Sequence, residues 1–268
     1  MAIYDCFQFF NENLILDIRL NILNEKVDYF VVSECVYDHQ GKKRSLNFDL
    51  NNFKKFKNKI IYIVVDKVDK KYLGPNYGPN SLIEQTQRNS IFKGLKNANA
   101  DDLIIISDVD EIPDLRKLGL YNSKNYGVFS QRMFNYKLNI LNVTESGWHG
   151  SKICKFKNLK TPHWLRTLKF KKYPFWRIDK IKNLQIIENG GWHFSYLQTP
   201  EAIRKKINSF SHGELLNSNL NNKGVIEKKI RNLEDIFDRK IKYKRVDLDE
   251  SFPKYIVQNK NKFKEWII

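Results

Sequence analysis

The chain has 268 residues, of which 41% are hydrophobic and 13% aromatic, and its formal net charge is +17 at pH 7. This composition supports a large buried core and excludes a disordered or fibrous protein. No segment approaches the roughly 18 consecutive apolar residues of a membrane-spanning helix, and residues 1–5 lack the basic start of a signal peptide. We therefore expect a single domain over residues 1–268 that acts in the cytoplasm.

The first part of the chain alternates predicted strands and helices, which is typical of a Rossmann-like α/β unit. Strands are predicted over residues 2–9, 28–36, 59–65 and 102–107, and helices over residues 13–25, 47–57 and 81–98. No Gly-x-Gly-x-x-Gly motif follows the first strand, and no Walker loop occurs. The sequence therefore disfavours a dinucleotide enzyme and a P-loop nucleotidase.

An acidic motif follows the last of these strands. The apolar residues 103–106 lead directly into Asp108, Asp110 and Glu111, and Pro113 cannot continue a central strand. Ligands of open α/β sheets bind at the carboxyl ends of strands, and Asp108 and Asp110 alternate so that both can face one divalent cation. Such a cation would suit a diphosphate. On these residues alone, a solvated turn that caps the next element is an equally open interpretation.

The second part of the chain gives weaker signals. Strands are predicted near residues 126–138, 148–156 and 183–196, and helices begin near residues 199, 224 and 253, without a domain boundary or an internal repeat. Residues 151–200 contain 11 lysine and arginine residues, two acidic residues and three tryptophans. Such a stretch can bind an acidic glycan, an anionic membrane surface or nucleic acid, and it can also be a solvated face over core tryptophans.

Four blocks of sequence together resemble glycosyltransferase family 17. They are residues 3–12, 28–34, 107–113 and 190–196, in the order of the family. This is the family of the β-1,4-mannosyl-glycoprotein β-1,4-N-acetylglucosaminyltransferases. The resemblance implies a GT-A-type, Rossmann-like α/β domain with a mixed central sheet flanked by helices. Residues 1–113 would bind the nucleotide sugar, and residues 114–268, with the C-terminal helices, would bind the acceptor. Since the Golgi members carry a membrane anchor, we expect a microbial or viral member.

The resemblance also implies the reaction and the site residues. We expect an inverting, metal-dependent transfer of a sugar, N-acetylglucosamine, from a UDP-sugar to a saccharide. Mn²⁺ or Mg²⁺ would be held by Asp110 as main ligand, by His193, and by Asp108, which contacts the ribose or a metal-bound water. Arg88 would neutralise phosphate or orient Asp108. The full set assigned to the nucleotide sugar is Asp5, Asn11, Glu12, Glu34, Arg88, Asn89 and Asp108.

Inversion needs a general base near the acceptor hydroxyl. Glu188, beside the glycine pair 190–191, is the first candidate, although a plain surface residue is an equally open interpretation; Glu145 and Glu111 follow. Trp148 and Trp192 are predicted to bind the acceptor, Trp192 by offering a stacking face for a sugar.

The expected partners are a UDP-sugar donor, a glycan or glycolipid acceptor and an anionic membrane at the inner membrane face. Two alternatives are a Mg-dependent nuclease or phosphotransferase and a noncatalytic module that binds glycan or nucleic acid. Neither alternative explains the four ordered blocks, so nucleic acid is a disfavoured partner.

Overall fold

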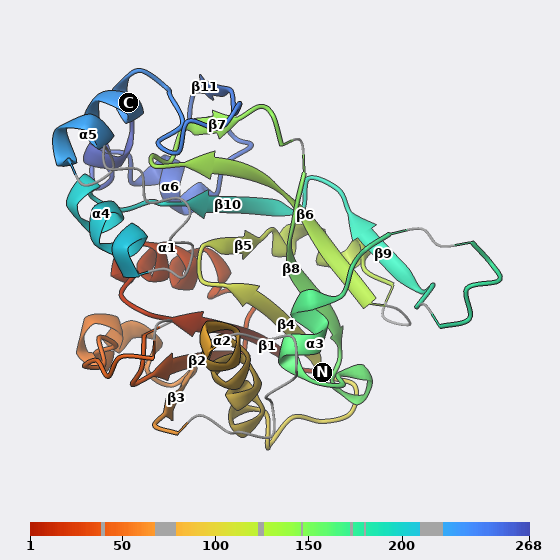
Figure 1. Ribbon diagram of the computed structural model, residues 1–268. Coiled ribbons are helices and arrows are strands. Elements are labelled where there is room, and N and C mark those ends of the chain that lie inside the picture. Colours follow the sequence, from red (N-terminus) through yellow and green to blue (C-terminus); the bar gives the residue numbers. More distant parts are fainter. Residues whose placement is uncertain are drawn as a thin grey trace.

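The computed structural model describes residues 1–38, 41–67, 79–122, 126–145, 147–171, 174–179, 181–209 and 222–268. These residues form one mixed sheet of 11 strands, with helices on both of its faces (Figure 1). Among the described helices, none has the length and apolar character that a membrane crossing requires.

The first four strands are parallel, in the order β3-β2-β1-β4. They are β1 (Ile3–Phe9), β2 (Tyr29–Cys35), β3 (Ile60–Val65) and β4 (Leu103–Asp108). Nearly continuous apolar runs form them because both faces of a parallel sheet are covered by helices. The register pairs Gln8 with Asp108 and Phe9 with Glu34, so the carboxyl ends of β1, β2 and β4 lie side by side. The predicted Rossmann-like first half is confirmed.

The later strands make the sheet mixed. They are β5 (Glu111–Pro113), β6 (Tyr126–Asn135), β7 (Ile140–Asn142), β8 (Trp148–Lys155), β9 (Leu184–Ile187), β10 (Gly191–Ser195) and β11 (Tyr243–Arg245). Strand β8 runs antiparallel between β4 and β6, and β10 lies antiparallel to β5 and parallel to β6. Gly191 has φ +145°, and a Cβ atom there would meet the Ile112 carbonyl oxygen at 2.2 Å, so only glycine allows this close approach of the two backbones.

Helices are shorter than the sequence pattern indicates. They are α1 (Asn13–Leu23), α2 (Pro79–Asn89), α3 (Pro162–Thr167), α4 (Pro200–Ser209), α5 (Lys223–Arg231) and α6 (Lys254–Gln258). The helix predicted over residues 81–98 ends at Asn89 and continues as a 3-10 turn, η3 (Ser90–Gly94). The helix predicted from residue 224 ends at Arg231, two residues before Leu233 adopts φ 59°. Left-handed residues commonly follow a helix end.

Alternate residues of β1 face the two main apolar cores. Phe7 and Phe9 belong to the core beneath α1 and α6, whereas Tyr4 and Cys6 belong to the core beneath η3 and α3. Asp5 faces the α1 side, as its contact with Arg19 of that helix shows. Because β4 lies between β1 and β8 at the centre of the sheet, both cores support the acidic motif at its end.

Candidate active site

Arg19 of α1 stabilises the backbone of the acidic motif. Its guanidinium is fully buried and binds the Asp5 carboxylate with two hydrogen bonds of 2.7 and 2.6 Å. Its Nη1 donates to the carbonyl oxygens of Asp108, Val109 and Glu111, at 3.2, 3.2 and 2.6 Å. One side chain therefore fixes the backbone of the whole turn. The prediction that Asp5 contacts the nucleotide is wrong, because its side chain is 0% exposed and both oxygens bind Arg19.

Glu34 has a similar structural role at the end of β2. Its Oε1 accepts from Arg44 Nη2 and Asn47 N, at 3.0 and 2.7 Å, and its Oε2 accepts from Phe48 N and Tyr62 Oη, at 3.0 and 2.8 Å. The Glu34 side chain is 0% exposed. Its predicted contact with the nucleotide sugar is therefore wrong: four donors occupy the carboxylate and fold residues 44–48 over the strand end.

Asp108, at the end of β4, binds two arginines. Arg88 Nη2 of α2 donates to its Oδ1 at 2.9 Å, and Arg166 Nη2 of α3 donates to its Oδ2 at 2.7 Å. Burial alone would raise the pKa of this carboxyl, but the two guanidinium charges outweigh it and hold the pKa well below its ordinary value. Of the two roles predicted for Arg88, the contact supports the orientation of Asp108.

Glu111 is the buried member of the motif. Its Oε1 accepts from Trp148 Nε1 and Arg166 Nη2, both at 2.6 Å, and its Oε2 accepts from the backbone N–H of Asp108 at 3.0 Å. Burial raises the pKa of Glu111 above its ordinary value, and the opposing charge of Arg166 does not fully offset this effect. The side chain is 1% exposed. Glu111 is therefore wrong as a general base: it positions Trp148 and Arg166 and has no free approach for an acceptor.

The short helix α3 brings Arg166 to the motif, a role the sequence reasoning missed. Thr161 caps the helix by accepting from Trp164 N at 3.0 Å, and Asn89 Oδ1 accepts from His163 N at 3.0 Å. At the other end, Lys152 Nζ donates to the carbonyl oxygens of Arg166 and Leu168. Asn89, predicted to bind the donor, is 5% exposed and serves to hold α3 instead. The missed Arg166 carried only one sequence signal, a cation inside the aromatic and basic stretch.

The side chain of Asp110, a member of the acidic motif, lies next to that of His193 on β10. His193 Nε2 is 3.5 Å from Asp110 Oδ2, and their side chains are 8% and 20% exposed. The backbone fixes the pair, because Phe194 N donates to the Asp110 carbonyl oxygen at 2.9 Å and His193 pairs with Glu111 in register. Burial would lower the pKa of His193, but the Asp110 carboxylate outweighs it and raises the pKa above its ordinary value. His193 Nδ1 is buried and has no partner among the described residues.

The predicted three-residue metal site is only partly assembled. Among the described residues, no group of three or more His, Cys, Asp or Glu side chains is arranged as a set of metal ligands. Each Asp108 carboxylate oxygen accepts from an arginine, whereas Asp110 and His193 are adjacent. A carboxylate and an imidazole fit two positions of a divalent ion whose other positions would be filled by phosphate or water.

The two tryptophans predicted to bind the acceptor lie on opposite faces of the sheet. Trp148 is half-buried, and its ring lies 5.1 Å from the His193 ring. Trp192 is 3% exposed in the main core, and its Nε1 donates to the Ser251 carbonyl oxygen at 3.1 Å. Neighbours on a strand alternate faces, so placing His193 in the site directs Trp192 into the core. Trp192 is therefore wrong as a sugar platform.

Glu188 is exposed on the turn after β9, and Glu145 is exposed in the loop after β7. Glu188 precedes β10 near Lys117, whose Nζ donates to its carbonyl oxygen at 3.1 Å. Glu145 lies between β7 and β8, where its backbone N–H donates to Asn142 Oδ1 at 3.1 Å. Asn142 Nδ2 in turn lies 3.6 Å from the sulfur of Met133, the register partner of His193. Glu145 is thus on the His193 side of the sheet.

A pocket of 220 Å³ opens at the carboxyl ends of β1 and β4. Its described lining residues are Gln8, Phe9, Phe10, Glu12, Tyr37, Glu84, Gln87, Arg88, Asp108, Val109 and Asp110. Glu12 is thus in the pocket as predicted, whereas the exposed Asn11 accepts from Gln198 Nε2 at 3.5 Å. A larger pocket of 360 Å³ lies beside α4, α5 and the C-terminal residues, and no residue of the acidic motif lines it. Because residues of the acidic motif line it, the smaller pocket is the candidate active site.

Comparison with known proteins identifies the family of the chain. The sequence profile of glycosyltransferase family 17 matches residues 1–265. The beta-1,4-mannosyl-glycoprotein 4-beta-N-acetylglucosaminyltransferases of Rattus norvegicus and Homo sapiens are each 22% identical over 222 residues, which cover 75% of this chain and 41% of the relative. The chain therefore spans about two fifths of the length of these relatives.

Two solved structures are similar at low scores. One is the 2-C-methyl-D-erythritol 4-phosphate cytidylyltransferase of Francisella tularensis, with a TM-score of 0.38, 7% identity, and coverage of 78% of this chain and 100% of that one. The other is the glucosyl-3-phosphoglycerate synthase of Mycobacterium tuberculosis in complex with Mn²⁺, UDP and phosphoglyceric acid, with a TM-score of 0.35, 10% identity, and coverage of 96% and 91%.

Proposed function

This chain belongs to glycosyltransferase family 17 and is a glycosyltransferase, and we propose that it transfers N-acetylglucosamine from a UDP-sugar to a saccharide acceptor with inversion. The observation that carries the proposal is the pocket at the ends of β1 and β4, where Asp108, Asp110 and Arg88 meet. In α/β sheets this edge is where nucleotides bind. The family membership also favours a transferase over the nuclease and the noncatalytic module.

The pocket offers suitable groups for each part of a nucleotide sugar. Phe10 and Tyr37 line it and supply aromatic rings against which a base can pack. Asp108 is 39% exposed and ionised, so it can accept from ribose hydroxyls while Arg88 and Arg166 hold its orientation. The two guanidinium groups also place positive charge beside the expected diphosphate, where it would stabilise the leaving group.

A divalent ion is part of the proposal. Asp110 and His193 would hold it, and when bound it would neutralise the charge of the departing diphosphate. A mixed oxygen and nitrogen pair suits Mn²⁺ better than Mg²⁺, which prefers oxygen ligands alone. Because the Asp110 carboxylate raises the pKa of His193, binding of the ion would compete with protonation of the imidazole and should weaken as pH falls.

For the general base, position favours Glu145 over Glu188. Glu145 precedes Trp148 by three residues, and the Trp148 ring contacts His193, so an acceptor stacked on Trp148 would lie near this loop. Glu188 belongs to the turn beside Lys117. Glu145→Gln should lower kcat by about a hundredfold or more and leave donor affinity unchanged, with Glu188→Gln as the matched control.

The first test is calorimetric binding of UDP-, GDP- and CMP-sugars, with and without Mn²⁺. The variants are Asp110→Asn and the control Asp101→Asn, whose side chain is 60% exposed just before the opposite end of β4. We expect one UDP-sugar to bind the wild type and Asp101→Asn in the presence of Mn²⁺ and to fail with Asp110→Asn. Absence of binding by every donor, or equal binding by Asp110→Asn, would overturn the proposal.

A further inference from the structure

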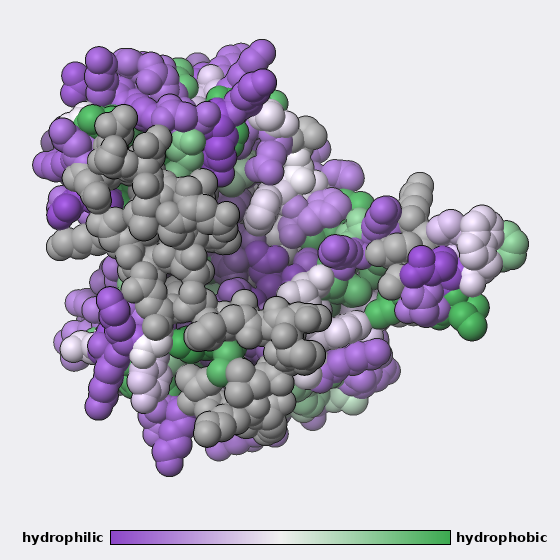
Figure 2. Space-filling model, in the orientation of Figure 1, coloured by the Kyte–Doolittle hydropathy of each residue, from purple (hydrophilic) through white to green (hydrophobic). Residues whose placement is uncertain are grey.

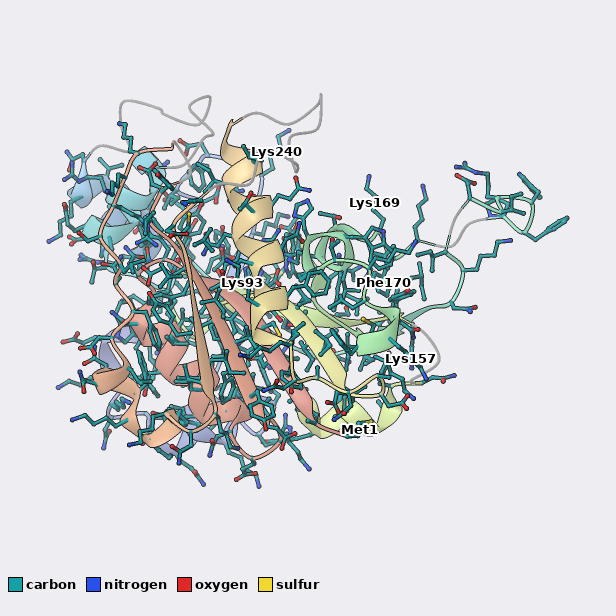
Figure 3. The ribbon with its side chains drawn as sticks, turned by 90° about the horizontal axis from the view of Figure 1, so that it is seen from below. Met1, Lys93, Lys157, Lys169, Phe170 and Lys240 are labelled. Carbon is teal, nitrogen blue, oxygen red and sulfur yellow. The ribbon has the colours of Figure 1, made fainter. Side chains whose placement is uncertain are left out.

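The segment between α3 and β9 projects from the body of the protein. It spans residues 168–183, of which 168–171, 174–179 and 181–183 are described. Figure 1 shows this segment extending away from the sheet, and Figure 3 shows Lys169 beside α3 at the base of the projection. The catalytic pocket uses none of its described residues.

Three large apolar side chains are exposed on the projection. Phe175 is 82% exposed, Trp176 is 66% exposed and Ile178 is 92% exposed. The Phe175 and Trp176 rings meet edge to face, with their centroids 5.2 Å apart. Single exposed apolar residues are common, but three within four positions on a projecting segment mark a surface that another molecule or phase covers.

Cationic residues flank this apolar group in the sequence. Residues 168–183 contain six lysine and arginine residues and one acidic residue, Asp179. Asp179 is paired with Arg177 at 2.8 Å, and Lys182 Nζ donates to the Phe175 carbonyl oxygen. In Figure 2 the projection shows hydrophobic side chains directly beside hydrophilic ones. With Arg177 paired, the five lysines of residues 168–183 leave the segment positively charged.

We propose that this projection docks the enzyme on an anionic lipid surface. Phe175, Trp176 and Ile178 would enter the interface between head groups and acyl chains, and the lysines would bind the anionic head groups. This combination of aromatic and aliphatic residues with lysines is typical of peripheral membrane anchors. An anionic lipid surface is complementary both to the exposed apolar side chains and to the lysines of the projection. Nucleic acid would satisfy the cations and the aromatic rings but would leave Ile178, the most exposed of the three, in water.

The base of the projection is tied to the active site. It leaves α3 immediately after Arg166, which binds Asp108 and Glu111. Lys152 Nζ donates to the carbonyl oxygens of Arg166 and Leu168, and it also lies 5.7 Å from the centre of the Phe170 ring. These contacts fix the base of the projection, residues 168–170, beside the acidic motif. A transferase docked in this way would reach a lipid-linked saccharide as its acceptor, an inference that rests on the proposed transferase function.

The test measures co-sedimentation of the full chain with two kinds of vesicle, pure phosphatidylcholine and phosphatidylcholine mixed with phosphatidylglycerol. The variant is Phe175→Ser/Trp176→Ser/Ile178→Ser. Its matched control, Leu50→Ser/Leu120→Ser/Val143→Ser, changes apolar side chains that are 42%, 63% and 46% exposed elsewhere. We expect the wild type and the control to bind the anionic vesicles, and the projection variant to bind at least about tenfold more weakly.

Several outcomes would overturn the docking proposal. They are wild-type protein that does not bind anionic vesicles, equal binding to both kinds of vesicle, and undiminished binding by the projection variant. Loss of single-stranded oligonucleotide binding in this variant, without vesicle binding by the wild type, would assign the surface to nucleic acid instead. All three proteins should bind the UDP-sugar equally, because the projection lies outside the pocket. Failure of donor binding by all of them would reject the proposed function and leave the docking result standing.

Discussion

Two arginine–carboxylate clusters contact the turn that follows β4, and they differ in how far they are buried. The Arg19–Asp5 pair is 0% exposed on both sides, and its spare donor binds three carbonyl oxygens of the acidic turn. The Asp108 cluster has the same chemistry, but Asp108 is 39% exposed and lines a pocket. The two clusters contain the same residue types, so burial distinguishes their roles. The buried Arg19–Asp5 pair stabilises the turn, whereas the partly exposed Asp108 can contact a ligand.

The largest expected effect is on stability, from Arg19→Met. This change leaves the buried Asp5 charge without its partner, which costs about 3–5 kcal/mol of unfolding free energy. Urea unfolding measures it, with Arg204→Met, which breaks the exposed pair with Glu201, as a control whose midpoint should not change. Asp5→Leu/Arg19→Met removes both charges and should recover much of the loss. A midpoint for Arg19→Met equal to that of the control would contradict the structural role.

Arg166→Met should have an intermediate effect on stability and should also weaken donor binding. Glu111 is buried and would lose a charged donor, so we expect a loss of about 1–3 kcal/mol of stability. Asp108 would lose one of its two orienting arginines, and donor affinity should fall about tenfold. Urea unfolding and donor calorimetry measure the two effects. Arg166→Lys retains a cation and should restore part of each; a variant with unchanged donor affinity would show that Arg166 only stabilises the fold.

A smaller effect on stability is expected from Asp108→Asn. Its side chain is more than one third exposed, so water screens its ion pairs, and the loss should stay below about 1 kcal/mol. Donor affinity should nevertheless fall about tenfold, because the ionised acceptor facing the pocket is removed. Urea unfolding and donor calorimetry measure these two effects. If Asp108→Asn destabilises the protein as strongly as Arg19→Met, the contrast between the two clusters is wrong.

The smallest effect is the pH dependence of His193. Its pKa is raised in the folded protein, so the interaction with Asp110 stabilises the fold fully below the ordinary pKa of 6.5 and is lost as pH rises through the folded value. Thermal unfolding of the wild type and His193→Gln should therefore differ most at acidic pH. The difference in Tm, a few degrees at most, should shrink toward pH ~8.5. A difference that grows with pH would exclude the predicted pairing.

Local patterns were sufficient for much of the fold. Apolar runs identified the four parallel strands, and the sequence placed Asp108 and Asp110 at the edge where the pocket lies. Helix ends were less accurate, because the pattern continued where a 3-10 turn or a left-handed residue ended the helix. The sequence also predicts a turn-rich loop at residues 67–80 and a buried helical stripe that includes Phe210. Most of this loop, and Phe210 itself, lie outside the described residues.

Whether a predicted site residue can contact a ligand depends on its hydrogen-bond partners in the fold. Asp5, Glu34 and Glu111 each follow or occupy a strand, as nucleotide ligands do, but each carboxylate is occupied by donors from a distant segment. Arg166 and Arg19 were missed for the same reason: a lone arginine in a helix has no pattern that names its partner. Trp192 and Trp148 could be told apart only once the register of β10 was known.

The sequence by itself determined the family, the α/β class and the position of the acidic motif, because these depend on local hydrophobic patterns and on blocks of residues in a set order. Only the tertiary structure decided which acids are buried, which arginines hold Asp108, and that Asp110 and His193 meet across 83 positions of chain. Strand pairing and long-range packing create these contacts, and the free energy of a charged group depends on the water and the partners that remain around it.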